Sequence, residues 1–337
     1  MTHLRVGVDI GGSKIAVLVV DGSDAVRARR LVAAASSEPD EAIAQIGAVV
    51  RDAVAEAGAT MADVSAVGVA VPGRVETASG DVTFAVNLGW QHLPLGRRLG
   101  AALGVPCVVE NDVRAAAVGL HRSQTFGPTD DLVFLGIGTG ISAGVILNGR
   151  LHRGVRGLAG EIGHVVLDPD GAACACGLHG CFETIAGGAG IARAARTAID
   201  AREATSLSDR DGTGDDRASD GPSAADVFSA AETGDPLARR LVDTAAAAIA
   251  RMVHELVLAY DVELVVIGGG ISRAGAPLLD RIRTRLERIV APSALATELL
   301  SETDLRLAGP DHDIGTRGAI ALLDPVAKEV VARQAVG

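Results

Sequence analysis

Runs of apolar residues mark the strands and helices that this chain is expected to form. Residues 4–10 and 64–71 are short, largely β-branched runs, which is typical of buried strands. Between them, residues 39–57 repeat apolar positions with the period of a helix, and Gly58 ends that helix. The alternation of such strands and helices predicts an α/β fold.

Glycine-rich turns follow several of the predicted strands. They are Gly11-Gly12-Ser13-Lys14, Gly138-Thr139-Gly140 and Gly268-Gly269-Gly270. A glycine backbone can approach a ligand closely, and successive N–H groups bind anions such as phosphate. Each of the first two turns lies between two predicted strands, and a hairpin signal follows the later strand in both cases. This repeated arrangement predicts a duplicated lobe. The third turn precedes a helix, which suits the α-phosphate and adenosine side of a nucleotide.

Two aspartates stand at the ends of predicted strands. Asp9 lies at the mouth of the first glycine turn, where a carboxylate can hold the waters of a Mg²⁺ ion; the alternative is an ordinary hairpin with a capping Asp. Asp112 follows strand 105–109 and opens a helix over 114–120. Open α/β folds bind ligands at the carboxyl ends of strands, so Asp112 either faces a cleft or serves only as a helix N-cap.

A loop asparagine, Asn87, stands near Trp90, the only tryptophan. An amide suits sugar hydroxyls and an aromatic ring suits the apolar face of a sugar. The alternative is a turn Asn beside a Trp that is packed in the core.

Three of the four cysteines, Cys174, Cys176 and Cys181, fall within eight residues. With His164 or His179 as the fourth ligand, they form the N/S set of a structural, tetrahedral Zn²⁺ site. Clustered cysteines of this kind indicate metal binding in a reducing compartment rather than a disulfide framework.

Composition and charge narrow the function classes. The chain has 337 residues, 48% of them hydrophobic, which is enough for two lobes with sizeable cores. The net charge of −11 argues against a general nucleic-acid binder. No apolar run reaches the length of a membrane span, and residues 1–4 lead into a strand pattern without a signal peptide. We therefore expect a cytoplasmic protein that contacts neither nucleic acid nor membrane.

The lobes are expected over 1–110 and 111–314, with a closing helix at about 315–325 that packs back on the first lobe. The second lobe would contain a zinc loop at 164–181. It would also contain a flexible insertion at 203–222, because that stretch is polar and lacks a period.

Together these motifs resemble the ROK family, which comprises repressors, uncharacterised open reading frames and sugar kinases. The resemblance extends over roughly residues 4–323 and is carried by Asp9–Lys14, Glu110-Asn111-Asp112, Gly138–Ile141, Glu161-Ile162-Gly163-His164 and the cysteine cluster. It implies a two-lobed actin-like, hexokinase-like (ribonuclease H-like) ATPase fold with duplicated lobes. It also implies an ATP-dependent hexose kinase, with ATP, Mg²⁺ and a structural Zn²⁺, that assembles as a homo-oligomer, either a dimer or a tetramer.

The resemblance further implies residue roles. Asp112 would be the general base; the sugar would be bound by Asn87, Asn111, Asp112, Glu161, His164 and Glu183; and the zinc ligands would be His164, Cys174, Cys176 and Cys181. The three glycine turns and Asp9 would bind the nucleotide and its Mg²⁺. Three departures from the family pattern, Arg114, Ser142 and Ala143, have no assigned role.

Glucose is the expected acceptor, at its 6-hydroxyl. N-acetylmannosamine or N-acetylglucosamine is the alternative. A sugar-sensing repressor is the rival from another class, but the expected core strand begins at Leu4, where such a repressor carries a DNA-binding segment.

Overall fold

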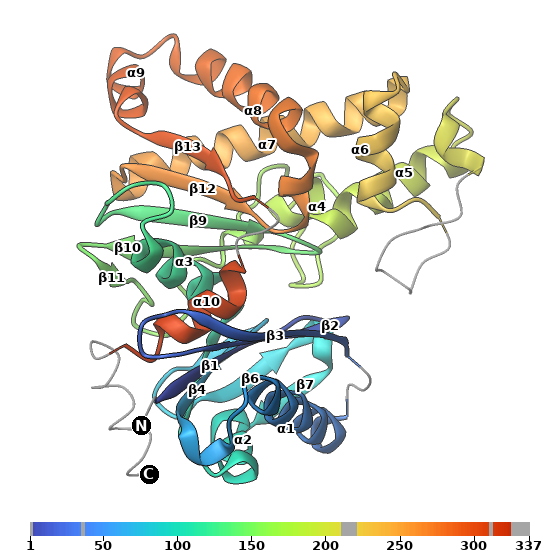
Figure 1. The fold of residues 1–337 in the computed structure, drawn as a ribbon. Helices are drawn as coiled ribbons and strands as arrows, with labels where there is room; N and C mark the ends of the chain where they lie inside the picture. The colour runs from blue at the N-terminus through green and yellow to red at the C-terminus, as the bar shows by residue number, and fades with distance from the viewer. Residues whose placement is uncertain (1–2, 35–37, 210–220, 310–312, 325–337) are drawn as a thin grey trace. The chain divides into compact units, whose positions relative to one another are not determined.

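The computed structural model describes residues 3–34, 38–209, 221–309 and 313–324, and these residues form a mixed α/β protein (Figure 1). Its first five-stranded sheet has the order β3 (Val26–Ala33), β2 (Lys14–Val20), β1 (Leu4–Ile10), β4 (Val64–Val71) and β8 (Cys107–Asn111). The second has the order β11 (Arg150–Leu151), β10 (Ile141–Leu147), β9 (Leu132–Ile137), β12 (Leu264–Gly268) and β13 (Asp304–Leu307). Each sheet therefore places its strands in the order third, second, first, fourth, fifth, which confirms the predicted duplication.

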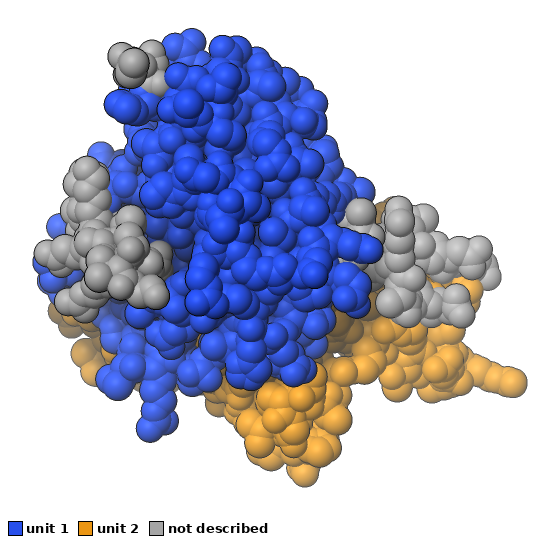
Figure 2. Space-filling view, turned by 90° about the horizontal axis from the view of Figure 1, so that it is seen from below, with its two compact units in different colours: residues 1–130, 144–159, 313–337 blue, residues 131–143, 160–312 orange. Residues whose placement is uncertain are grey.

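The chain folds into two compact units (Figure 2). Unit 1 takes its described residues from 1–130, 144–159 and 313–337, and unit 2 from 131–143 and 160–312. Unit 1 continues past residue 110, where the sequence analysis places its boundary. The reason is that α3 (Asp112–Ser123) packs on the first sheet, with Ala115 in one apolar cluster with Val108.

Helices cover both faces of the unit 1 sheet (Figure 1). On one face, α1 (Pro39–Glu56) and α2 (Leu95–Leu103) enclose a core that includes Val17 and Val19 of β2. On the other face, Leu18 and Val20 of the same strand contact α10 (Ile314–Ala321) through Ile320. This alternation follows from the two-residue period of a strand.

The backbone of α10 lies directly against two strands. A Cβ atom on Gly7 of β1 would stand 2.1 Å from the carbonyl oxygen of Thr316. One on Gly68 of β4 would stand 1.8 Å from the carbonyl oxygen of Ala319. Both strands therefore need glycine at these positions, and the closing helix packs within unit 1.

The parallel register of unit 1 aligns the ends of three strands. Asp9 of β1 pairs with Ala70 of β4, which pairs in turn with Glu110 of β8. Because these strands run parallel, their carboxyl ends meet at one edge of the sheet. Asp9 and Asn111, the last residue of β8, lie at this edge, where open α/β folds bind ligands.

A small sheet in unit 1 was not predicted. It consists of β5 (Arg74–Glu76), β6 (Asp81–Ala85) and β7 (Trp90–Leu93) in consecutive antiparallel pairs. These strands are short, and turns interrupt their apolar pattern. Sequence periodicity therefore gives little signal for them.

Unit 2 contains most of the helices. They are α4 (Phe182–Ala186), α5 (Gly188–Asp200), α6 (Ala224–Glu232), α7 (Pro236–Tyr260), α8 (Gly275–Val290) and α9 (Ala294–Ser301). A capping box begins α6, since the side chains of Ser223 and Asp226 each accept a hydrogen bond from the backbone amide of the other. Among the described residues, no helix combines the length and the apolar character that a membrane span requires.

Part of the predicted flexible insertion is ordered, while residues 210–220 lie outside the described residues. Ser206–Asp209 form a 3-10 helix in which Leu207 is fully buried. Asp235, the N-cap of α7, accepts hydrogen bonds from the Ser206 amide at 2.6 Å and from the Thr205 hydroxyl at 2.9 Å. The polar composition of the stretch gave no sign of this ordered structure, because a single buried leucine produces no periodic pattern.

Candidate functional site

Asn111 and Asp112 form a corner between β8 and α3. The Asn111 side-chain oxygen accepts a hydrogen bond from the Arg114 amide at 3.1 Å, so Asn111 is the N-cap. The alternative that Asp112 is the cap is therefore wrong, because Asp112 is the first residue of the helix. Its Oδ1 accepts hydrogen bonds from the Asn111 side-chain amide at 3.0 Å and the Val113 amide at 2.9 Å. These two donors orient the carboxylate.

Asp9 lies beside the first glycine turn, which the Gly11 amide closes by donating to the Lys14 carbonyl at 2.8 Å. Burial, and secondarily the charge of Asp112, raises the pKa of Asp9 to about 7. The Asp9 carboxylate packs against the first turn of α10, where a Cβ on Gly315 would stand 2.1 Å from its Oδ2. This requirement for glycine was missed, although a glycine in the first turn of a predicted helix was visible in the sequence.

Asn87 and Trp90 have different surroundings. Asn87 lies in the 3-10 helix Val86–Leu88 with its side chain exposed, and its carbonyl oxygen would be 3.8 Å from a Cβ on Gly12. Trp90 is only 2% exposed and belongs to the core of unit 1. The interpretation of Trp90 as a sugar platform is therefore wrong, since its ring is enclosed by the core.

The remaining two glycine turns lie in unit 2. Gly188 and Ala189 at the start of α5 donate to the carbonyls of Gly138 and Thr139, at 2.8 and 3.2 Å. Gly269 adopts φ +85°, and a Cβ there would stand 2.4 Å from the Ile137 carbonyl oxygen. Glycine is thus required at Gly269 by packing.

Two glycines of these turns face open space instead. A Cβ on Gly138 or Gly270 would meet no atom within 4 Å. A 3-10 helix, Gly270–Ala274, comes between the third turn and α8, so the predicted helix does not begin directly after the glycines. At Gly138 and Gly270 the chain leaves room for a ligand to approach its backbone.

Glu161 and Glu183 lie near the cysteine loop in sequence and structure. Glu161 immediately precedes the 3-10 helix Ile162–His164. Glu183 is in α4, where its Oε1 lies 3.7 Å from His164 Nδ1 and accepts a hydrogen bond from the Cys174 thiol at 3.1 Å. Its Oε2 would lie 3.0 Å from a Cβ on Gly140, so Glu183 also borders the second glycine turn.

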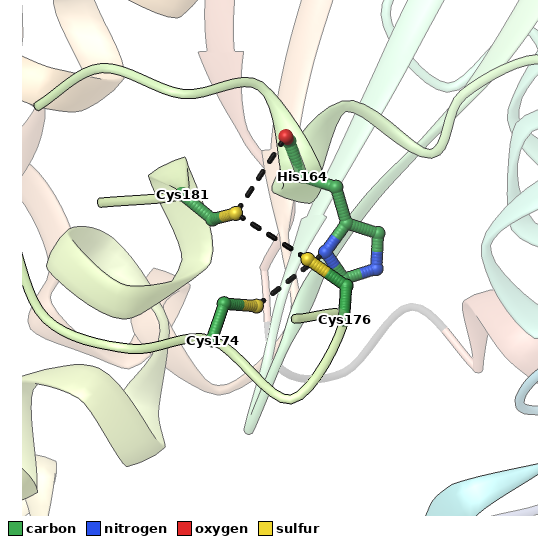
Figure 3. A group of neighbouring side chains, drawn as sticks. All are labelled: His164, Cys174, Cys176 and Cys181. Carbon is green, nitrogen blue, oxygen red and sulfur yellow. Dashed lines mark hydrogen bonds between the residues drawn. The ribbon is translucent and has the colours of Figure 1, made fainter. Parts of the chain in front are cut away.

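The predicted metal ligands converge (Figure 3). One ligand atom from each of His164, Cys174, Cys176 and Cys181 lies within 4.8 Å of every other. His179, the rival fourth ligand, is exposed and is not part of this group; its backbone forms a bridge with Ala173.

Two distances within this cluster match those around a tetrahedral zinc ion. Cys176 and Cys181 have their sulfur atoms 3.6 Å apart, and Cys174 Sγ lies 3.7 Å from His164 Nδ1. A Zn²⁺ ion with bonds of about 2.3 Å to sulfur and 2.0 Å to nitrogen separates its ligands by about 3.5–3.8 Å. Three thiols and one imidazole are a structural zinc set, and the cluster indicates such a site.

Comparison with known proteins gives the family. A family model described as "ROK family" matches residues 5–325. The chain belongs to the ROK family. This ROK family chain is 35% identical to the glucokinase of Streptomyces coelicolor over 293 residues, which are 85% of this chain and 87% of that protein. It is also 35% identical to the N-acetylmannosamine kinase of Salmonella typhimurium over 326 residues, 96% of this chain and 98% of that protein.

A solved ROK structure has the same fold. It is the ROK family glucokinase from Streptomyces griseus in complex with glucose and AMPPNP, which matches with a TM-score of 0.77 and 34% identity, covering 95% of this chain and 98% of that one. The relatives of this ROK protein thus include kinases named for two different sugars, at the same identity.

Proposed function

We propose that this protein is an ATP-dependent hexose kinase that phosphorylates the 6-hydroxyl of glucose. The observation that carries the proposal is the corner at Asn111 and Asp112, where a side-chain amide orients a carboxylate at the carboxyl ends of the parallel strands of the unit 1 sheet. Membership of the ROK family, with glucokinases among the relatives, supports the same activity.

Asp112 is the proposed general base. Its carboxylate accepts the proton of the attacking hydroxyl, while the Asn111 amide holds Oδ1 in place at 3.0 Å. Phosphoryl transfer needs alignment of the reactants and neutralisation of phosphate charge more than covalent catalysis. An oriented carboxylate is therefore enough to activate the attacking hydroxyl. Asn87, Asn111, Glu161, His164 and Glu183 are the proposed hydrogen-bonding partners of the other sugar hydroxyls.

The glycine turns are the proposed phosphate sites. Open space beside Gly138 and Gly270 allows a phosphate to approach the backbone N–H groups there. Gly12 is bordered only by a carbonyl oxygen 3.8 Å away, and Asp9 stands next to this turn. A Mg²⁺ ion at Asp9 would neutralise phosphate charge, and Asp9 would hold it through water.

The zinc cluster has a structural role in this proposal. Its four N/S ligands leave no position for a reacting water. His164 turns Nδ1 toward Cys174, so its Nε2 is the atom that can contact a sugar hydroxyl. The metal would thereby fix the tautomer of a substrate-binding histidine.

A coupled ADP-release assay over a panel of hexoses tests the function. We expect ADP release to require glucose and Mg²⁺, and kcat/KM for glucose to exceed that for mannose and for the N-acetylated sugars. ADP release that does not depend on any sugar would contradict the kinase assignment. The oligomeric state, for which we propose a homodimer or tetramer, is measured on the same preparation by light scattering.

N-acetylmannosamine is the second candidate acceptor. The N-acetylmannosamine kinase of Salmonella typhimurium matches 96% of this chain, more than the 85% matched by the Streptomyces coelicolor glucokinase at equal identity. A kcat/KM for N-acetylmannosamine ten times that for glucose would replace the substrate and keep the enzyme class.

A further inference from the structure

A buried charge network lies next to the corner at Asn111 and Asp112. Glu110 is 1% exposed and Arg114 is 2% exposed, and the two are 3.5 Å apart. Glu110 also accepts hydrogen bonds from the backbone amide of Asn111 at 2.9 Å and from Arg153 Nε at 2.7 Å. The desolvation of such charges is costly unless each has partners, and here each does.

Arg114 extends this network to the segment 153–159. Its guanidinium donates to the Gly157 carbonyl oxygen at 2.5 Å. Gly154 and Gly157 have φ values of +71° and +63°, and the segment forms neither helix nor strand. Its Val155 is 105% exposed, so burial of that side chain does not hold the segment in place. Two contacts tie the segment to buried side chains: the hydrogen bond from Arg114 to Gly157 and the ion pair of Arg153 with Glu110.

The chain continues from this segment through Gly160 directly to Glu161. Gly160 has φ +94°, and its carbonyl oxygen accepts a hydrogen bond from the Ala143 amide at 2.8 Å. The backbone before Glu161 is thus held on the one side by Arg114 and on the other by Ala143.

We propose that Arg114 is a positioning residue that fixes segment 153–159 and thereby sets the affinity for the sugar through Glu161. This inference rests on the proposed hexose kinase function, in which Glu161 binds the sugar. Arg114 touches no reacting atom in this scheme. Its loss should therefore act on sugar binding and leave the phosphoryl-transfer step nearly unchanged.

Arg114→Gln tests this role, because it removes the charge and keeps much of the side-chain length. We expect KM for glucose to rise about 10- to 100-fold, the range for loss of a charged hydrogen bond, with kcat within threefold of wild type. Hydrogen exchange at the Gly157 and Ala159 amides should be at least tenfold faster, while amides of β4 and β8 keep their protection. Arg114→Lys should recover part of the affinity, because it keeps the charge opposite Glu110.

The matched control is Arg74→Gln. Arg74 is exposed and donates to the carbonyl oxygen of Arg156, in the same segment, at 3.5 Å; because this hydrogen bond is long and open to solvent, its loss should leave both KM and exchange close to wild-type values. If Arg114→Gln fails to fold because Glu110 keeps only Arg153 as a cationic partner, Arg114→Lys serves in its place: it keeps a charge opposite Glu110 and should still show a raised KM, by less than Arg114→Gln would.

The outcomes separate the two proposals. A wild-type protein that phosphorylates no sugar would overturn the kinase function and, with it, the role in sugar affinity. An active enzyme in which folded Arg114 variants show normal exchange at 153–159, or lose kcat with KM unchanged, would overturn the role of Arg114 alone.

Discussion

The side-chain oxygen of Asn111 caps helix α3 by accepting the Arg114 amide at 3.1 Å, and the same residue donates its amide to Asp112 at 3.0 Å. Asn111 thus both caps helix α3 and orients the carboxylate of Asp112. Asp112 can be changed without removing the cap. This separates the chemistry of Asp112 from the stability of the helix that follows it.

Asp112→Asn should abolish most phosphoryl transfer and leave the fold intact. Asn cannot accept the hydroxyl proton, so we expect the rate to fall by ~10²–10⁴ or more. Stability should change by no more than about 1 kcal/mol, the usual effect of one charge in the first turn of a helix. Thermal melting, glucose titration and turnover of the purified variant measure these three quantities. A folded variant that binds glucose and retains a third of wild-type turnover would remove Asp112 from the mechanism.

Asp9 should destabilise the protein at neutral pH in the absence of metal. Its pKa is about 7 in the folded state, above the ordinary value of 3.8. The folded state therefore favours the protonated form, and the free energy of unfolding falls as the pH rises from about 4 to 7. We expect Asp9→Asn to be more stable than wild type at pH 8 by about 1–3 kcal/mol, although inactive.

Urea unfolding of wild type and Asp9→Asn at pH 5 and pH 8 measures this effect. The stability gap should be larger at pH 8 and smaller at pH 5. Adding Mg²⁺ with ATP should stabilise the wild type more than the variant. Equal stability of the two proteins at both pH values would show that the ionised Asp9 carboxylate does not destabilise the fold.

Cys176→Ser should lose a bound zinc ion and weaken glucose binding. The remaining three ligands cannot complete the site, and the loop that carries His164 loses its anchor. Elemental analysis and glucose titration of the purified protein measure both effects. His179→Ala is the control, because His179 is exposed and is not part of the cluster; it should keep the metal. Wild-type protein that is fully active without zinc would contradict the proposed role of the cluster.

Asp235→Ala should destabilise unit 2 by about 1–3 kcal/mol at pH 7, because it removes a helix cap together with buried hydrogen bonds. Burial alone would raise the pKa of Asp235, but hydrogen bonds from Ala238, Ser206 and Thr205 outweigh it and lower the pKa to about 2. The carboxylate therefore stabilises the fold above about pH 4, and this contribution disappears as the pH falls toward 2. Urea midpoints at pH 7 and pH 3 should show a smaller difference at the lower pH.

Long periodic patterns and glycine turns made much of the fold predictable. The helix expected over residues 39–57 is α1, Pro39–Glu56, because its proline, its apolar period and the glycine that follows it all agree. Strand β1 was predicted with its observed bounds, Leu4–Ile10. The pairing of the cysteines with His164 rather than His179 needed the structure or the family, since spacing from the cysteines allows either histidine.

Other features depend on contacts between distant residues and could not be read from the sequence. Trp90 is buried because it belongs to an apolar cluster that also includes residues of α1 and α2, and no local sequence pattern reports that. Arg114 finds its partner 43 residues away, at Gly157. Asn111 and Asp112 are both good N-caps by residue type, so only the backbone shows which of them begins the helix.

The close packing of α10 against Gly7 and Gly68 has a consequence for biosynthesis. Residues 314–321 cover a face of a sheet whose strands are made more than 200 residues earlier. On the ribosome, the part of that face that α10 covers stays open until all of unit 2 has been translated. The later unit can therefore complete its fold first, and the nascent chain presents an exposed sheet surface of the kind that chaperones bind.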